Sequence, residues 1–345
     1  MQLDPTEALA KFAETFSQGV RALAPSPRWQ DPSRYFPPGE PQPDDPAFDV
    51  DLERINADFP AWLDPGPIEA PRSAEVVRSA ARFEFPSPRP GGGAHGDRVI
   101  LKLYRPPAKP PPVVILFHPW LFFQLWLPVD WLLAPLVERY RVAVMVAPFH
   151  LARAAKGFAS GEGFVNPNPL RIYEGFRRWQ ADHLASCALL AREAGGAAVL
   201  PVGYSLGGYG LLRNRLVRPR CPAVTICVTN SFARGVYEGG HGDRLRHGVA
   251  AAGFTRQRFE LLTRSLHLAR WAPRIGGDEL TWIHARHDDI EPSESLREAR
   301  LALAPERTIE VGGGHVTAML DRQTIVDEIA RRAERMASRG DAGTI

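Results

Sequence analysis

The segment around Ser205 constrains the fold of this chain more than any other part of the sequence. Residues 203–207 read Gly-Tyr-Ser-Leu-Gly; they follow an apolar run over residues 197–202 and open a helix-forming segment over residues 206–216. A short apolar run of this kind is typical of a buried strand. Between a strand and a helix, such a pentapeptide forms a sharp turn that lifts the serine hydroxyl clear of the sheet. The sequence therefore predicts a strand, a strained turn and a helix, although a glycine-rich turn with Ser205 merely exposed stays open.

The pattern on both sides of this turn predicts an α/β protein. Two apolar segments flank the glycine run at residues 91–93 and predict an antiparallel hairpin, whereas the later strands alternate with helices. Alternation at this spacing favours a mostly parallel sheet with helices on both faces. Ser295 and Glu298 have capping-box spacing, which predicts that a helix begins there. The expected strands cover residues 81–85, 99–104, 113–117, 142–146, 197–202, 223–228, 280–285 and 308–311, and the main helices cover residues 131–140, 172–193 and 325–336.

Changes of composition divide the chain into four parts. Residues 1–75 contain an amphipathic pattern over residues 4–23, then a proline-dense stretch expected to form an extended arm on the surface. The α/β core is expected over residues 76–230 and 278–338. Residues 231–277 break the alternation and are predicted to be an inserted cap, and residues 339–345 are predicted to be a flexible tail.

Composition excludes some classes of partner. The formal net charge of the 345-residue chain is +3, and its basic residues are scattered, so the footprint of a nucleic-acid binder is missing. Cys187, Cys221 and Cys227 lie in apolar contexts without zinc spacing, which indicates buried, reduced thiols. The N-terminus shows no secretory signal pattern, so a cytoplasmic location is expected.

One stretch, residues 113–137, is apolar enough to be considered as a transmembrane helix. It contains histidine, aspartate and three prolines, which are costly in a lipid-spanning helix, so no transmembrane span is predicted. Peripheral contact of the amphipathic N-terminal pattern with a membrane stays open, as does the oligomeric state.

A serine hydroxyl needs a general base, and that base needs an orienting carboxylate. Two loops supply them after predicted strands. The strand over residues 280–285 runs into Asp288-Asp289-Ile290-Glu291-Pro292, and the last strand runs into three glycines followed by His315. Both loops are expected at the sheet edge that carries Ser205. Asp289 and Glu291 remain alternatives to Asp288 as the acid.

The order Ser, Asp, His and the loops that carry them resemble the α/β-hydrolase superfamily of serine esterases and lipases, from about residue 80 to the last helix. The resemblance implies the α/β-hydrolase fold and a catalytic triad of Ser205, Asp288 and His315. It also implies two backbone N–H donors for an oxyanion, of which Leu206 supplies one. Proline at position 119 has no N–H, so Trp120 is the candidate for the second donor.

The loop at residues 120–127 is strongly apolar and would lie beside the reacting carbonyl. It predicts a pocket for an acyl or aryl group, and packing into the core is an equal alternative. The segment from residue 150 to residue 162 is expected to be an ordinary solvated loop, with lining of the site as the lesser alternative. The candidate substrate-binding residues are His118, Phe122, Phe123, Tyr204 and His150.

The resulting hypothesis is a serine hydrolase. It would cleave a small-molecule carboxylic ester with a hydrophobic acyl or aryl group through an acyl-enzyme on Ser205, with no cofactor and no metal. Acyl transfer by the same three residues is one alternative. A non-catalytic binding or scaffold protein of the same fold is another, because fold alone does not fix function.

Overall fold

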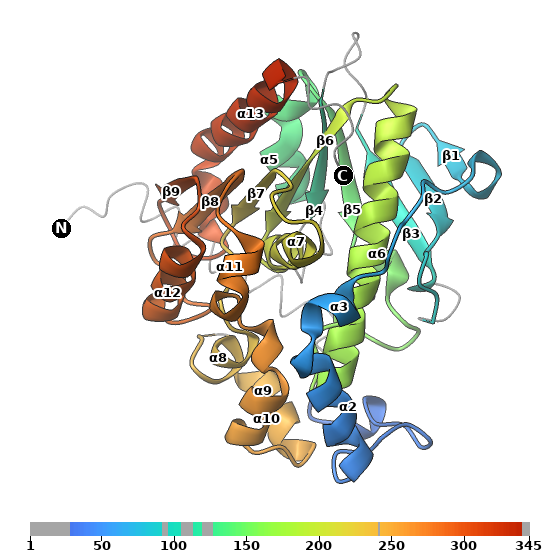
Figure 1. Ribbon diagram of the computed structural model, residues 1–345, viewed down its shortest axis with the longest axis vertical. Helices are drawn as coiled ribbons and strands as arrows, with labels where there is room; N and C mark the ends of the chain where they lie inside the picture. The colour runs from blue at the N-terminus through green and yellow to red at the C-terminus, as the bar shows by residue number, and fades with distance from the viewer. Residues whose placement is uncertain (1–27, 92–95, 105–112, 119–126, 241, 340–345) are drawn as a thin grey trace.

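The computed structural model describes residues 28–91, 96–104, 113–118, 127–240 and 242–339. Its centre is a nine-stranded sheet with the strand order β1-β2-β3-β5-β4-β6-β7-β8-β9 (Figure 1). The strands are β1 (Val77–Ser79), β2 (Arg82–Pro86), β3 (Arg98–Leu103), β4 (Val113–His118), β5 (Arg141–Val146), β6 (Ala198–Tyr204), β7 (Ala223–Ile226), β8 (Leu280–Ala285) and β9 (Arg307–Val311).

The sheet is parallel from β5 to β9 in its spatial order and antiparallel at the other end. β2 pairs antiparallel with β1 and β3, and β3 pairs antiparallel with β5. The remaining neighbours, β5-β4-β6-β7-β8-β9, pair in parallel. The predicted α/β class, the mostly parallel sheet and the hairpin of β2 and β3 are thereby confirmed.

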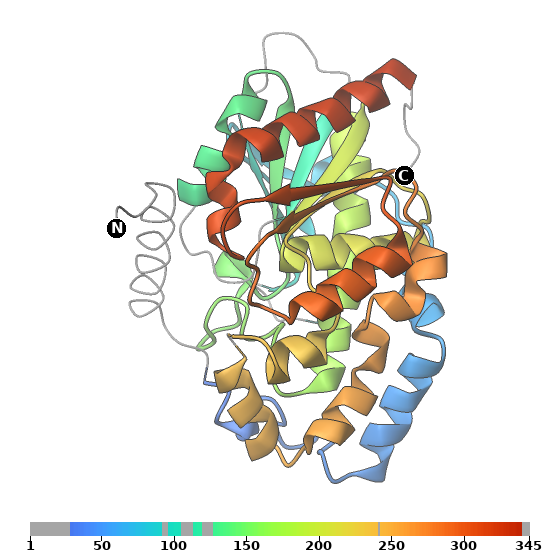
Figure 2. The ribbon, with the colours of Figure 1, turned by 90° about the vertical axis from the view of Figure 1, so that its left-hand side faces the viewer.

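Side chains alternate across the sheet and give each face its own apolar layer. In β4, Val114 and Leu116 belong to one core cluster, and Ile115 and Phe117 belong to the other. The first cluster meets α6 (Pro169–Glu193), α7 (Leu206–Val217) and α12 (Ser293–Leu303). The second cluster meets α5 (Leu127–Val137) and α13 (Arg322–Arg339), and Figure 2 shows α13 lying across that face.

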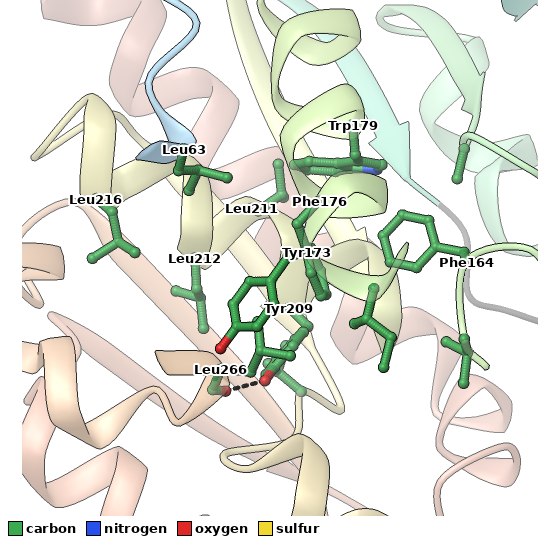
Figure 3. Close-up of a cluster of buried hydrophobic side chains, with 14 of the residues drawn as sticks. Leu63, Phe164, Tyr173, Phe176, Trp179, Tyr209, Leu211, Leu212, Leu216 and Leu266 are labelled. Atoms are coloured by element: carbon green, nitrogen blue, oxygen red, sulfur yellow. Dashed lines mark hydrogen bonds between the residues drawn. The ribbon is translucent and has the colours of Figure 1, made fainter. Parts of the chain in front are cut away.

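Aromatic packing joins α6 and α7 on the first face (Figure 3). The rings of Phe176 and Tyr209 lie 5.4 Å apart between centroids. A Cβ at Gly210 would stand 2.9 Å from the Trp179 ring, so the glycine lets α7 approach α6 closely. The Tyr209 hydroxyl donates to the carbonyl of Leu266, which ties α7 to the segment before β8. The helix that carries the Ser205 turn is therefore fixed on several sides.

A group of short helices lies beyond the carboxyl ends of the parallel strands, at the bottom of Figure 1. Between β7 and β8 the chain forms α8 (Phe232–Tyr237), α9 (Asp243–Ala251), α10 (Arg256–Leu262) and α11 (Ala272–Ile275). The N-terminal segment adds α2 (Pro46–Ala57), which packs beside α10, and α3 (Phe59–Leu63), which packs beside α6. Phe48 of α2 and Phe254 pack with their ring centroids 5.7 Å apart.

The expectation of an extended arm is wrong over the region of α2 and α3. Pro46 occupies the first position of α2, where a missing N–H costs nothing, and Asp45 caps the Ala47 N–H. Asp58 caps α3 in the same way through the Ala61 N–H. Proline density in this region marks helix starts instead of preventing helices.

The prediction that a capping box at Ser295 starts a helix is also wrong. α12 begins at Ser293 after Pro292, and the Ser295 hydroxyl bonds the carboxylate of Glu291 instead of capping a helix. The predicted helix at residues 4–23 and all but the first residue of the predicted tail lie outside the described residues. Within the described part of the chain, no helix is long and apolar enough to cross a membrane.

Candidate active site

Ser205 lies at a strained turn between β6 and α7, with φ 53° and ψ −118°. A Cβ at Gly203 would stand 2.4 Å from the Gly208 nitrogen, and one at Gly207 would stand 2.1 Å from the His118 carbonyl oxygen. Only glycine fits at these two positions, because both obstacles are backbone atoms. The Ser205 N–H donates to the Ile226 carbonyl at 2.7 Å, which fixes the turn to β7. The predicted strand, turn and helix are thus present.

The loop after β9 brings His315 back toward Ser205. Gly313 has φ +80°, and a Cβ there would stand 2.6 Å from Thr317 Oγ1. The Gly314 N–H donates to the same hydroxyl oxygen at 2.7 Å. The glycines before His315 therefore permit a tight reversal of the chain.

Three side chains from separate strand ends form one hydrogen-bonded chain. His315 Nε2 lies 2.7 Å from Ser205 Oγ, and His315 Nδ1 lies 2.9 Å from each carboxylate oxygen of Asp288. The side chains of His315 and Asp288 are each 4% exposed. A carboxylate accepts the Nδ1–H, so Nε2 presents its lone pair to the serine hydroxyl. This arrangement can accept a proton from Ser205.

Of the three acids in the loop after β8, Asp288 is the one that the structure places against His315. Glu291 is buried and accepts hydrogen bonds from the Asn230 and Ser231 N–H groups and from the Ser295 hydroxyl. Burial raises the pKa of Glu291 to about 7, and these hydrogen bonds lower it less. Asp289 accepts the Gly240 N–H through its backbone carbonyl. Glu291 thus links the acid loop to the start of α8.

Leu206 is the first residue of α7, and its N–H is one of the four that a helix leaves without an internal partner. It directly follows Ser205, as the predicted first oxyanion donor must. Trp120, the second predicted donor, lies outside the described residues, as do Phe122 and Phe123.

The other three candidate substrate residues are buried. Tyr204 is fully buried, and its hydroxyl donates to the backbone carbonyl of His315 at 2.6 Å. His118 Nε2 lies 3.0 Å from His183 Nδ1, and burial holds the pKa of His118 well below its usual value. His150 Nδ1 lies 2.7 Å from the Pro148 carbonyl, and burial lowers the pKa of His150 to about 4. Protein atoms therefore surround all three side chains, and their contact with substrate stays a prediction.

The segment after β5 is not the solvated loop that was expected. Arg153 is fully buried and pairs with Asp182 of α6 at 2.7 Å. Glu162 is 1% exposed and accepts hydrogen bonds from the Tyr35 hydroxyl at 2.6 Å and from Arg34 Nε at 3.2 Å. Buried charges need such partners, so this segment is locked both to α6 and to the N-terminal segment. Sequence reasoning missed these contacts, whose partners lie 29 to 128 residues apart.

A cavity of about 540 Å³ lies at the other end of the strands. Its lining includes the start of β6 at Ala198 and Val199, Pro222 just before β7, and the last residues of α7 and α13. Ser205 lies at the carboxyl end of β6, so this cavity is remote from the hydrogen-bonded chain.

The topology and the strand ends that carry Ser205, Asp288 and His315 are those of an α/β-hydrolase fold. The structure is similar to TT1662 from Thermus thermophilus, with a TM-score of 0.51 and 17% identity over 75% of this chain and 98% of that one. It is also similar to the C6-C4 SN3 inhibited esterase B from Lactobacillus rhamnosis, with a TM-score of 0.50 and 11% identity over 86% and 98% of the two chains. No protein-family model and no curated protein sequence matches the chain.

Proposed function

We propose that this protein is a serine hydrolase that cleaves a carboxylic ester through an acyl-enzyme on Ser205. The observation that carries the proposal is the continuous chain from Ser205 Oγ through His315 to Asp288, with links of 2.7 and 2.9 Å. Hydrogen-bond reach between nucleophile and base, with the base oriented by a third group, is the signature of nucleophilic catalysis.

In the proposed first step, Ser205 Oγ attacks the ester carbonyl while His315 Nε2 takes the hydroxyl proton. Asp288 holds the imidazole through Nδ1–H and stabilises its positive charge. The tetrahedral oxyanion accepts a hydrogen bond from the backbone N–H of Leu206 and a second one from that of Trp120, the donor predicted from the sequence. His315 then returns the proton to the leaving alcohol. In the second step, water gives a proton to His315 and its oxygen attacks the acyl carbon. The bond from that carbon to Ser205 Oγ then breaks while His315 returns the proton to Oγ, which releases the acid and restores Ser205.

We assign residues 231–277 as a cap over this site. Helices α8, α9 and α10 lie beyond the carboxyl ends of the strands, on the side where Ser205 follows β6, whereas α11 packs against α7 and α12 (Figure 1). Glu291, three residues after Asp288, supports the assignment. Its carboxylate accepts hydrogen bonds from the N–H groups of Asn230 and Ser231, which ties the start of residues 231–277 to the acid loop. A cap at this position would close over a substrate and exclude water from the reacting carbonyl. The proposed hydrophobic acyl or aryl preference rests on the apolar sequence of residues 120–127.

Hydrolysis of nitrophenyl esters of graded chain length tests the proposal. Ser205→Ala should lower kcat by roughly 10³-fold or more, because it removes the nucleophile. It should leave the melting temperature nearly unchanged, since the hydroxyl adds no core packing. Ser33→Ala is the matched control, because the exposed Ser33 hydroxyl bonds the exposed Asp31 in the N-terminal segment, far along the chain from Ser205. Wild-type turnover in folded Ser205→Ala would contradict the proposed mechanism. Preference for acetate over longer chains would contradict the proposed hydrophobic pocket.

A further inference from the structure

Tyr204, the residue before the proposed nucleophile, is fully buried beneath the loop that carries His315. It is the last residue of β6, and its side chain joins the apolar layer on the α13 side of the sheet. Its ring meets the imidazole of His315 edge to face, with the centroids 6.3 Å apart and the planes at 85°. The hydroxyl donates to the backbone carbonyl of His315 at 2.6 Å.

The His315 loop has several restraints, and they tie it to different parts of the molecule. Thr317 binds the Gly314 N–H, so this bond stays within the loop. The His287 N–H donates to the Gly313 carbonyl at 3.0 Å, which ties the loop to the segment that carries the acid. The bond from Tyr204 ties the loop to the strand that carries Ser205. Because Tyr204 and Ser205 are adjacent, this bond fixes the base relative to the nucleophile through one peptide unit.

The surroundings of the Tyr204 hydroxyl keep it protonated, so it can donate to this carbonyl. Burial raises the pKa of Tyr204 well above its usual value, and the nearby Cys227 thiol and Asp288 carboxylate raise it further. Cys227 is itself buried and follows β7. A buried carbonyl that loses its donor cannot recover one from water here, so removal of the hydroxyl would leave the His315 carbonyl to shift toward another partner.

We propose that Tyr204 is a positioning residue, whose buried hydroxyl holds the backbone of His315 so that Nε2 stays within hydrogen-bond reach of Ser205. The proposal rests on the proposed function of the three linked side chains. The bond from Tyr204 to the His315 carbonyl would position the imidazole whatever the substrate is.

Tyr204→Phe removes the hydroxyl and keeps the ring. A displacement of the base by a fraction of an ångström to 1 Å lowers the rate of the chemical step, so kcat should fall by about 10- to 100-fold. KM should stay within about twofold of the wild-type value, because the side chain of Tyr204 is enclosed by protein atoms. In proton NMR spectra, the downfield Nδ1–H resonance of His315 should shift or broaden.

Tyr140→Phe is the matched control. Tyr140 is also a buried tyrosine in the same apolar layer, and its hydroxyl also donates to a backbone carbonyl, that of Ala330 at 3.3 Å. Both variants lose a buried hydroxyl–carbonyl bond, and Tyr204→Phe also loses the contacts of its hydroxyl with Cys227 and Met319, so its melting temperature should fall at least as far as that of Tyr140→Phe. Only Tyr204→Phe should change kcat and the His315 resonance. A Tyr204→Phe variant with wild-type kcat and an unchanged resonance overturns the proposal, as does an equal change in Tyr140→Phe.

Two further measurements distinguish a role of the Tyr204 hydroxyl from a role of its ring, and failure of this proposal from failure of the proposed function. Tyr204→Leu removes ring and hydroxyl together; if only this variant is slow, ring packing and not the hydroxyl positions His315, and the proposal is overturned. In the wild-type protein, the Tyr204 hydroxyl proton should exchange slowly and show a nuclear Overhauser contact to backbone protons of His315 and Val316. Absence of that contact overturns the proposal even if Tyr204→Phe does not fold. Absent ester turnover in the wild type would defeat the proposed function alone, because the NMR measurements need no substrate.

Discussion

The buried ion pair between Arg153 and Asp182 gives a quantitative test of how the segment after β5 is held. Both side chains are 0% exposed, and Arg153 Nη2 lies 2.7 Å from Asp182 Oδ2. Arg153 also donates to the Val146 and Gly96 carbonyls at 2.9 and 3.0 Å, and the Ser87 hydroxyl donates to Asp182 Oδ1 at 2.5 Å. These bonds join α6, the end of β5 and the segment around β2.

Asp182→Ala should be strongly destabilising, because it leaves the guanidinium of Arg153 buried without a counter-charge. Removal of one partner of a buried pair costs about 3–5 kcal/mol, and the lost hydrogen bond from the Ser87 hydroxyl, which keeps the Arg89 carbonyl as an acceptor, adds roughly 1 kcal/mol. The expected loss of about 4–6 kcal/mol is a large share of the stability of a typical folded protein. Urea unfolding followed by circular dichroism and tryptophan fluorescence measures it.

Two comparisons make the result interpretable. The double variant Arg153→Met/Asp182→Leu replaces both charges with apolar groups and should be less destabilised than Asp182→Ala, because no charge stays buried. Asp51→Ala breaks an exposed pair with Arg54 and should cost less than about 1 kcal/mol. The reasoning is refuted if Asp182→Ala costs no more than Asp51→Ala, or if the double variant is the least stable of the three.

Two further predictions concern the segments around the site. The pKa of Glu291 is raised to about 7 from its usual 4.5, so the stability it contributes is present below the lower value and is lost as pH rises through the higher one. Glu291→Gln has no such proton, so its unfolding free energy should fall less than that of the wild type between about pH 5 and pH 8; parallel profiles would contradict this. Gly207→Ala should abolish ester turnover and lower the melting temperature, because its Cβ would meet the His118 carbonyl, whereas Gly312→Ala has open space and should be tolerated in both assays.

Local signals predicted most of the sheet. Apolar runs bounded by turns predicted β4, β5, β6 and β8 nearly to the residue, and the hairpin of β2 and β3 followed from the same pattern. Around Ser205, the glycines at positions 203 and 207 predicted a tight turn because a side chain there would strike backbone atoms. These predictions succeeded because their physical causes act between residues close together in the chain.

Contacts between distant segments were not predictable in the same way. Arg153 and Glu162 looked like surface charges, since charged residues are mostly exposed, and nothing near them in sequence identifies Asp182 or Tyr35 as partners. Tyr204 was a candidate for substrate binding, and nothing near it in sequence shows that its hydroxyl bonds the backbone carbonyl of His315, 111 residues later.

In the candidate site, too, part of the prediction is confirmed and part stays a prediction. The sequence order and the loops predicted which serine, acid and histidine would meet, and the structure places His315 within hydrogen-bond distance of both Ser205 and Asp288. Their catalytic roles stay predictions. The roles of Trp120, Phe122 and Phe123 also stay predictions, since these residues lie outside the described part of the chain.

Covalent labelling of the folded protein by a fluorophosphonate, read by mass spectrometry of the peptides, tests the activation of Ser205 most directly. A serine hydroxyl reacts readily with this probe only when a base takes its proton. The account predicts one adduct, on the peptide that contains Ser205, and labelling at least about 10²-fold slower in His315→Ala. An unlabelled Ser205 in folded wild-type protein, or equal labelling rates in wild type and His315→Ala, would contradict it.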